Sequence, residues 1–255
     1  MKSPVVYGLA LTAATLGLPH CSGPGPLAGG SGAGNPGGAA TFAVVADTAA
    51  PQTGLPKSLR TLSAHDSPGG LNIRSKDGLV LRIESARLVV HEIEFVLNSS
   101  PLCGGLPAPA AGALRCDSQT VVLSGPFTFD LLSGKSTPRI DGLHLPASEY
   151  IGVRLHVAEE GLCGGGNDAC FSLRLEGRFT YANTIRQFLV EVAPYVAKLY
   201  KHSNSPILVT RNDTTHLSVR LDADTWLENV ALTECLDGGF VPLNAEGKLV
   251  IDEET

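Results

Sequence analysis

Three acidic side chains near the C-terminal end of the chain have a spacing that could serve a metal site. Asp222, Asp224 and Glu228 lie where we expect a strand to lead into a short helix. Calcium requires six to eight oxygen ligands, and the D-x-D-x-D-G loop that usually supplies them is missing here. Helix capping and exposure to solvent are the simpler interpretation. These residues are therefore only weak candidates for a metal site.

Two histidines offer a second set of possible metal ligands, because both occur in β-prone segments. Strand pairing could bring His91 and His156 together, with Glu92 or Glu94 as a further ligand for zinc. Each histidine is isolated in the sequence, without an H-x-H pair. Histidines that are half-exposed on a sheet, with no metal, are the simpler interpretation.

The patterns of the common catalytic sites give no candidate nucleophile. The G-x-S-x-G pattern is missing, and no serine lies between a strand and a helix. Paired acids for glycoside cleavage stay open, because their separation in space is not visible in a sequence. Asn167 and Asp168 are candidate ligand-binding residues in a glycine-rich loop, although tight turns use the same residue types. We therefore expect a non-catalytic protein without a cofactor.

Five of the six cysteines lie beyond the N-terminal segment, and their spacing favours disulfides over zinc. Two local pairs flank turn-prone segments, Cys103 with Cys116 and Cys163 with Cys170. Exported chains pair most of their cysteines, and neither spacing matches the C-x₂₋₄-C knuckle of structural zinc sites. We predict these two disulfides from proximity in the sequence. Cys235 is then a small, buried, unpaired side chain.

The elements that would position these residues are strands. Short runs of β-prone residues alternate with Gly and Pro breaks, which is typical of an all-β protein. We predict an antiparallel β-sandwich, Ig-like or prealbumin-like, over residues 71–255, with one short helix at 223–230. The longest run is residues 79–97. In it we expect one face with Val89, His91, Ile93 and Phe95 and the other with Leu88, Val90, Glu92 and Glu94.

The N-terminal segment has the features of an export signal. Lys2 precedes an uncharged, mostly apolar run, residues 5–18, which is too short to span a bilayer. The run leads into Leu18-Pro19-His20-Cys21, and Cys21 is itself followed by Ser, Gly and Pro. We therefore expect residues 1–20 to be a lipoprotein-type signal peptide and Cys21 to be lipidated.

A tether is expected between this signal and the sandwich. Residues 22–40 contain eight Gly and three Pro and no charged side chain. Such a segment buries too little apolar surface to offset the entropy of ordering it. We expect residues 21–70 to form a disordered, Gly/Pro-rich tether. The alternative is ordinary cleavage near Ala33 or Ala40, which would release a soluble, secreted protein.

The overall charge restricts the partners. The formal net charge is −6, the isoelectric point is about 5.6, and Lys and Arg do not cluster. Binding to nucleic-acid phosphates requires a basic stripe, so we expect no nucleic-acid partner. A polybasic membrane patch is also missing, which leaves a lipid anchor as the expected membrane contact.

Four segments, in this order, resemble a family of bacterial surface lipoproteins with a domain of unknown function. They are residues 82–90, the Gly-Pro-Phe-Thr-Phe-Asp-Leu-Leu-Ser-Gly run at 125–134, the Leu-Pro-Ala-Ser-Glu-Tyr run at 145–150, and 217–226. The resemblance covers about residues 79–230. It implies a fold like the prealbumin-type and carbohydrate-binding-like β-sandwiches and a location on the cell envelope. It brings no catalytic residues.

Within these segments the motifs have structural interpretations. Phe127, Phe129 and Leu131 should alternate inward and Asp130 outward. Tyr150 should pack at a corner of the sandwich with its hydroxyl group bonded. This chain has Glu149 where the family has Gly before the tyrosine.

Together these features predict a non-catalytic surface lipoprotein of the bacterial cell envelope, anchored in the outer membrane. Its β-sandwich would serve in adhesion, as a scaffold, or in binding an envelope protein or a glycan. The first alternative is a dedicated carbohydrate-binding protein, although aromatic residues make up only 5% of the chain. The second is a hydrolase or metal-dependent enzyme that uses the acids near Asp222.

Overall fold

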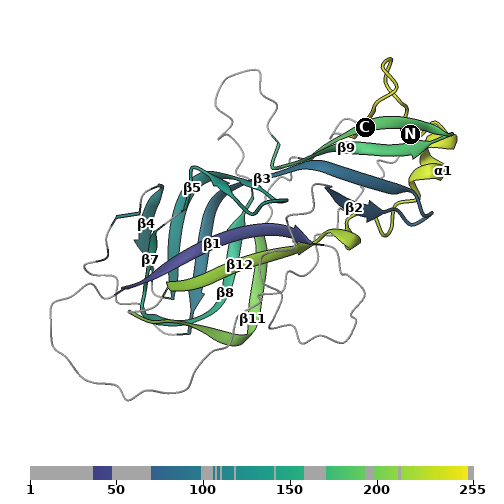
Figure 1. The fold of residues 1–255 in the computed structure, drawn as a ribbon. Coiled ribbons are helices and arrows are strands. Elements are labelled where there is room, and N and C mark those ends of the chain that lie inside the picture. Colours follow the sequence, from purple (N-terminus) through teal and green to yellow (C-terminus); the bar gives the residue numbers. More distant parts are fainter. Residues whose placement is uncertain are drawn as a thin grey trace, which may run out of the picture.

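In the computed structural model the protein has an all-β fold, as predicted from the sequence (Figure 1). The structure describes residues 37–47, 70–98, 106, 108–109, 111–117, 119–140, 142–157, 171–192, 198–211 and 214–251. Its strands are β1 (Gly37–Asp47), β2 (Leu71–Arg74), β3 (Val80–Leu97), β4 (Ala113–Cys116), β5 (Thr120–Asp130), β6 (Ser136–Thr137), β7 (Leu143–Pro146), β8 (Ser148–His156), β9 (Leu173–Tyr181), β10 (Thr184–Val192), β11 (Lys198–Val209), β12 (Thr214–Asp222) and β13 (Leu249–Ile251). A 3₁₀ turn, η3 (Ala223–Thr225), and a short helix, α1 (Leu232–Asp237), complete it.

Two sheets face each other across one core. The smaller sheet has the order β12-β1-β7, and the larger one contains the other ten strands. The larger sheet is organised by β3, which is long enough to pair with two strands along each edge. Its first part pairs with β2 and β9, and its second part pairs with β5 and β8. In Figure 1 the first part of β3, with β9 and β2, extends away from the body in which β1 and β12 cover the larger sheet.

Two register shifts divide β3 into three segments. One shift lies between Ile83 and Ser85 opposite β9, and the other between Val90 and Glu92 opposite β5. Each extra residue exchanges the faces of all the side chains that follow it. The buried positions are consequently Leu81 and Ile83, then Ala86, Leu88 and Val90, and then Ile93, Phe95 and Leu97.

The alternation that the sequence predicted for β3 is therefore wrong at one point. We expected Val90 and Glu92 to share a face, but Val90 is in the core while Glu92 is half-exposed. The shift occurs at His91, between two runs that each alternate regularly. A simple period of two cannot detect a single extra residue.

Aromatic rings join the two sheets. Phe42 of β1 meets Phe95 of β3 edge-on, with 5.5 Å between ring centroids, and Phe129 of β5 at 6.0 Å. Tyr150 of β8 meets Phe95 at 6.4 Å, also edge-on. Edge-to-face pairs at these distances add about 0.5–1.5 kcal/mol each beyond the area that they bury. The core of the sandwich thus depends on one aromatic side chain from the smaller sheet.

This arrangement corrects the expected tether, which was to extend over residues 21–70. Residues 37–47 instead form β1, whose backbone pairs in parallel with β12 and antiparallel with β7. Phe42, Val44 and Ala46 of this strand are buried. Glycines at the start of β1 do not weaken it, because the chain there passes very close to neighbouring backbone. A Cβ at Gly38 would collide with the carbonyl oxygen of Thr210.

Two further expectations need correction. The sandwich is not purely antiparallel, because β1 pairs with β12 and β10 with β13 in parallel. The short helix is also displaced from its expected range of 223–230. Only the η3 turn forms there, and the α-helix begins at Leu232.

The corner tyrosine and the inward phenylalanines are confirmed. The Tyr150 hydroxyl donates a hydrogen bond to the carbonyl oxygen of Pro146 at 2.9 Å, and the ring is buried. Burial raises the pKa of this phenol. Phe127 and Phe129 are fully buried on β5, and Asp130 is exposed.

Helix α1 is held at its N-terminus by a side chain that is distant in sequence. Its own N-cap residue, Ala231, offers no capping side chain. Asp77, in the β2–β3 turn, accepts hydrogen bonds from the amides of Thr233 (2.5 Å) and Glu234 (3.2 Å). Desolvation alone would raise the pKa of Asp77, but these bonds and one from the Ser75 hydroxyl outweigh it and lower the pKa to about 2.

We expect Asp77→Ala to lower the free energy of unfolding by about 1 kcal/mol at pH 7, as losses of helix caps typically do. The folded pKa lies below the ordinary value of 3.8. The contribution of Asp77 should therefore be complete above about pH 4 and vanish as the pH falls toward 2. Urea unfolding of both chains between pH 7 and 2 tests this, with the exposed Glu228→Gln as control. A difference that is the same at pH 7 and pH 2 would contradict the capping role.

Candidate functional site

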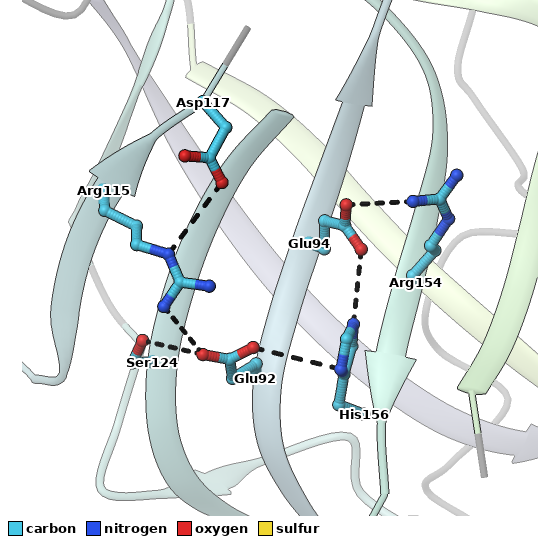
Figure 2. A network of polar contacts seen from close by, with 7 residues as sticks. All are labelled: Glu92, Glu94, Arg115, Asp117, Ser124, Arg154 and His156. Atoms are coloured by element: carbon cyan, nitrogen blue, oxygen red, sulfur yellow. Dashed lines mark hydrogen bonds and ion pairs between the residues drawn. The ribbon is translucent and has the colours of Figure 1, made fainter. Parts of the chain in front are cut away.

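Seven polar residues form one connected cluster on the outer face of the larger sheet, opposite the core (Figure 2). We call this cluster the charged face. It spans β4, β5, β3 and β8, and its members are Glu92, Glu94, Arg115, Asp117, Ser124, Arg154 and His156.

Strand register explains why these side chains meet. Glu92 is opposite both His156 on β8 and Ser124 on β5, and Glu94 is opposite Arg154. Residues that are directly opposite in an antiparallel pair place their side chains on the same face, a few ångströms apart. Residues two positions apart in a strand lie on the same face, so the pair of Glu94 and Arg154 lies beside the pair of Glu92 and His156.

The register shift at His91 is what turns the two glutamates outward. Without that extra residue, Glu92 and Glu94 would follow Leu88 and Val90 into the core. Two carboxylates there would have no solvent and no cation, at a cost of several kcal/mol each. The shift thus creates the charged face and keeps Ile93 and Phe95 buried.

Each glutamate of β3 is paired with an arginine: Glu94 with Arg154 on the adjacent strand β8, and Glu92 with Arg115 on β4, which lies beyond β5. Arg154 Nη1 lies 2.9 Å from Glu94 Oε1, and Arg115 Nη1 lies 2.9 Å from Glu92 Oε1. The Ser124 hydroxyl also donates to Glu92 Oε1, at 3.3 Å. Arg115 Nε is within 4.0 Å of Asp117, which extends the cluster to the end of β4.

His156 lies between the two carboxylates. Its Nε2 is 3.3 Å from Glu94 Oε2, and its Nδ1 is 3.9 Å from Glu92 Oε2. The side chains of His156, Glu92 and Glu94 are only 16%, 23% and 14% exposed. Charges that are partly withdrawn from water interact more strongly than charges on an open surface. The imidazole therefore lies between the two ion pairs and connects them into one continuous cluster.

The sequence found part of this cluster but assigned it to different chemistry. We weighed His156 with Glu92 or Glu94 as zinc ligands, together with His91. The structure brings the first three together, whereas His91 lies at the register shift and is not one of the residues of the charged face. Among the described residues, no group of three His, Cys, Asp or Glu side chains is arranged to hold a metal.

The arginine partners were missed, although a signal was present. Glu92-x-Glu94 on one strand and Arg154-x-His156 on another have matching spacing and opposite charge. That complementarity would have favoured an ion-paired ladder over a metal site.

Of the weak metal candidates near the C-terminal end, Asp222 has a structural role. Asp222 Oδ1 accepts a hydrogen bond from the amide of Asp224 at 3.2 Å and so caps the η3 turn. Glu228 is exposed and accepts a hydrogen bond from its neighbour Asn229. The capping interpretation that we preferred for Asp222 is confirmed.

Most of the other predicted residues lie outside the described part of the chain. This applies to Cys21, Cys103, Cys163, Cys170 and the candidate ligand-binding residues Asn167 and Asp168. Cys116, at the end of β4, is disulfide-bonded. Its pairing with Cys103 stays a prediction. Cys235 is a free cysteine on α1 and is half-buried.

Comparison with protein-family models, with curated proteins and with solved structures gave no match. The resemblance to surface lipoproteins therefore stays an expectation from the four sequence segments. No helix among the described residues is long and apolar enough to cross a bilayer.

We expect the pair of Glu94 and Arg154 to show a coupling free energy of about 1 kcal/mol, because both side chains are partly withdrawn from solvent. Urea unfolding of Glu94→Gln, Arg154→Gln and the double variant measures it. Raising the salt concentration should reduce the coupling. The more exposed pair of Arg178 and Glu84 is a suitable control and should couple more weakly. Additive effects of Glu94→Gln and Arg154→Gln would show that the contact stabilises nothing.

Proposed function

We propose that this chain is a non-catalytic surface lipoprotein of the bacterial cell envelope whose β-sandwich binds an envelope protein through the charged face. The observation that carries the proposal is that four strands hold acidic and basic side chains in one pre-arranged pattern on the face opposite the core.

The pattern suits a protein partner better than chemistry. The two glutamates and their arginines are already engaged with each other, so none of these four is an isolated acid or base. Fixed charges of both signs favour the selection of a partner with the complementary pattern and increase the rate of encounter. The outer arginine, Arg115, has a side chain that is 56% exposed and remains accessible to such a partner.

The location is supported by the N-terminal sequence and by the position of β1. The first strand begins at Gly37, so that fifteen residues separate it from Cys21. A Gly-rich chain of this length reaches about 20 Å. A lipid on Cys21 would therefore keep the sandwich close to the membrane surface.

Lipidation is tested by metabolic labelling of producing cells with an alkyne-modified fatty acid. The native chain should be labelled, and Cys21→Ala should lose the label because acylation requires this thiol. Cys235→Ala is the matched control and should keep it. Label that persists in Cys21→Ala would rule out the anchor, and an unlabelled chain in the medium would favour the secreted alternative.

Partner binding is tested with a photo-crosslinking amino acid in living cells. Ala113 is exposed and lies opposite Ser124 on the charged face, whereas Asn72 is exposed on β2, away from it. A probe at 113 should give a defined protein adduct that a probe at 72 does not give. Arg115→Glu should remove that adduct by reversing one exposed charge.

Equal adducts from positions 72 and 113, or an adduct that is indifferent to Arg115→Glu, would contradict the proposed binding face. A glycan array with the purified chain distinguishes the carbohydrate-binding alternative. If the chain binds a glycan and Arg115→Glu abolishes that binding, the ligand of the charged face is a sugar and not a protein.

A further inference from the structure

A second site lies far from the charged face along the chain, where β10 and β13 approach each other. A pocket of about 300 Å³ is lined by residues 185–187 at the start of β10 and by residues 246–248 of the turn before β13. The two strands pair in parallel from Phe188 and Leu249 onward. The pocket occupies the place where this pairing has not yet begun.

Arg186 is the unusual residue of this pocket. Its Nε is buried, and the described part of the chain provides no hydrogen-bond partner for it. Arg186 also has no ion pair there, whereas two arginines of the neighbouring strand β9, Arg174 and Arg178, pair with glutamates. Arg186 as a whole is half-buried, and a buried guanidinium N–H without an acceptor is costly. An anion bound to the other N–H groups of this guanidinium would balance its charge.

The turn opposite Arg186 is built to admit its side chain. Gly247 has a positive φ of 74°, and a Cβ at this position would collide with Nη1 of Arg186. The turn is fixed by Asn244, whose Oδ1 accepts hydrogen bonds from the amides of Glu246 (3.0 Å) and Lys248 (2.9 Å). The guanidinium is thereby held against the wall of the pocket.

The charges that surround Arg186 favour an anionic ligand. Lys248 adds a second cation to the lining and Gln187 adds an amide, while Glu246 contributes one opposing carboxylate. A further acid, Asp237, is engaged elsewhere, because it accepts a hydrogen bond from the hydroxyl group of Tyr181. The lining thus carries a formal charge of +1, with two cations against one carboxylate.

We propose that this pocket binds a small oxyanion, the carboxylate or phosphate group of a ligand, with Arg186 as the main donor and Lys248 as the second cation. The planar guanidinium matches both groups, because it can donate two parallel hydrogen bonds to their oxygens. This site is independent of the proposed envelope partner and of the charged face.

The test is an NMR titration of the full chain at constant ionic strength, with acetate and inorganic phosphate in separate arms. The Nε–Hε resonance of Arg186, assigned with Arg186→Lys, should shift and saturate in at least one arm. The arm that saturates at lower concentration identifies the carboxylate or the phosphate as the preferred group. Constant ionic strength is needed because general screening also moves side-chain resonances.

The variants give the expected order of affinities. Arg186→Gln, followed through the backbone amide of Gly247, should weaken binding about tenfold or more because the main charge-assisted contact is lost. Lys248→Gln, which changes only a half-exposed side chain, should weaken it about threefold. Glu246→Gln should tighten it about threefold by removing the opposing charge. Arg178→Gln, which breaks an ion pair on the neighbouring strand, should leave the affinity unchanged.

Three results would overturn the proposal. The first is the absence of a saturable shift in the native chain. The second is anion binding that appears only in Glu246→Gln, which would mean that the Glu246 carboxylate itself pairs with the Arg186 guanidinium in solution. The third is an equal loss in Arg178→Gln and Lys248→Gln, which would indicate general electrostatics. If Arg186→Gln does not fold, the roughly threefold loss of affinity expected for Lys248→Gln still tests the proposal.

Discussion

The packing of Phe42 against Phe95 and Phe129 is the contact on which the sandwich depends. It is the aromatic link between the smaller sheet and the larger one. A sheet with one apolar face is stable only when that face is covered. β1 provides the cover together with β12 and β7, to which it is hydrogen-bonded on its two sides. The smaller sheet therefore has β1, a segment rich in glycine and alanine, as its middle strand.

The second constraint is the length of β3. This strand of 18 residues does not keep a single alternation as it passes from one part of the core to another. Its two register shifts solve this problem by exchanging the faces at defined points. At the first shift β3 stays aligned with β9, whose Gly177 lets the backbones approach closely, since a Cβ there would collide with the carbonyl oxygen of Arg82. At the second shift the glutamates turn outward. The charged face is thus a consequence of how the core is built.

The two proposed sites use charge in different ways. On the charged face, cations and carboxylates pair with each other, and the result is a pattern of both charges that a partner could match. At the start of β10, Arg186 has no ion pair and its Nε has no hydrogen-bond partner among the described residues, which is the basis of the proposed anion site. The first arrangement suits the recognition of a surface and the second suits a single small group.

The sequence by itself determined the fold class, the strand character of most segments and the roles of several core residues. Tyr150, Phe127 and Phe129 were predicted correctly because local alternation and turn residues decide their environment. The sequence also paired His156 with Glu92 and Glu94, but as possible metal ligands. The prediction missed that residues 37–47 form a strand. Its Gly and Ala residues have low β-propensity and hid the β-prone Phe42, Val44 and Val45, and the pairing with the distant β12 and β7 is visible only in the structure.

Only the tertiary structure decided the faces of β3, the arginine partners of the two glutamates and the pocket beside Arg186. Each of these depends on which strand lies beside which, and with what register. Cross-strand contacts join residues about 60 positions apart, such as Glu94 and Arg154. A single bulged residue shifts them all by one face. No local pattern in the chain encodes that choice, because it is the packing of the two sheets that makes one register more stable than the other.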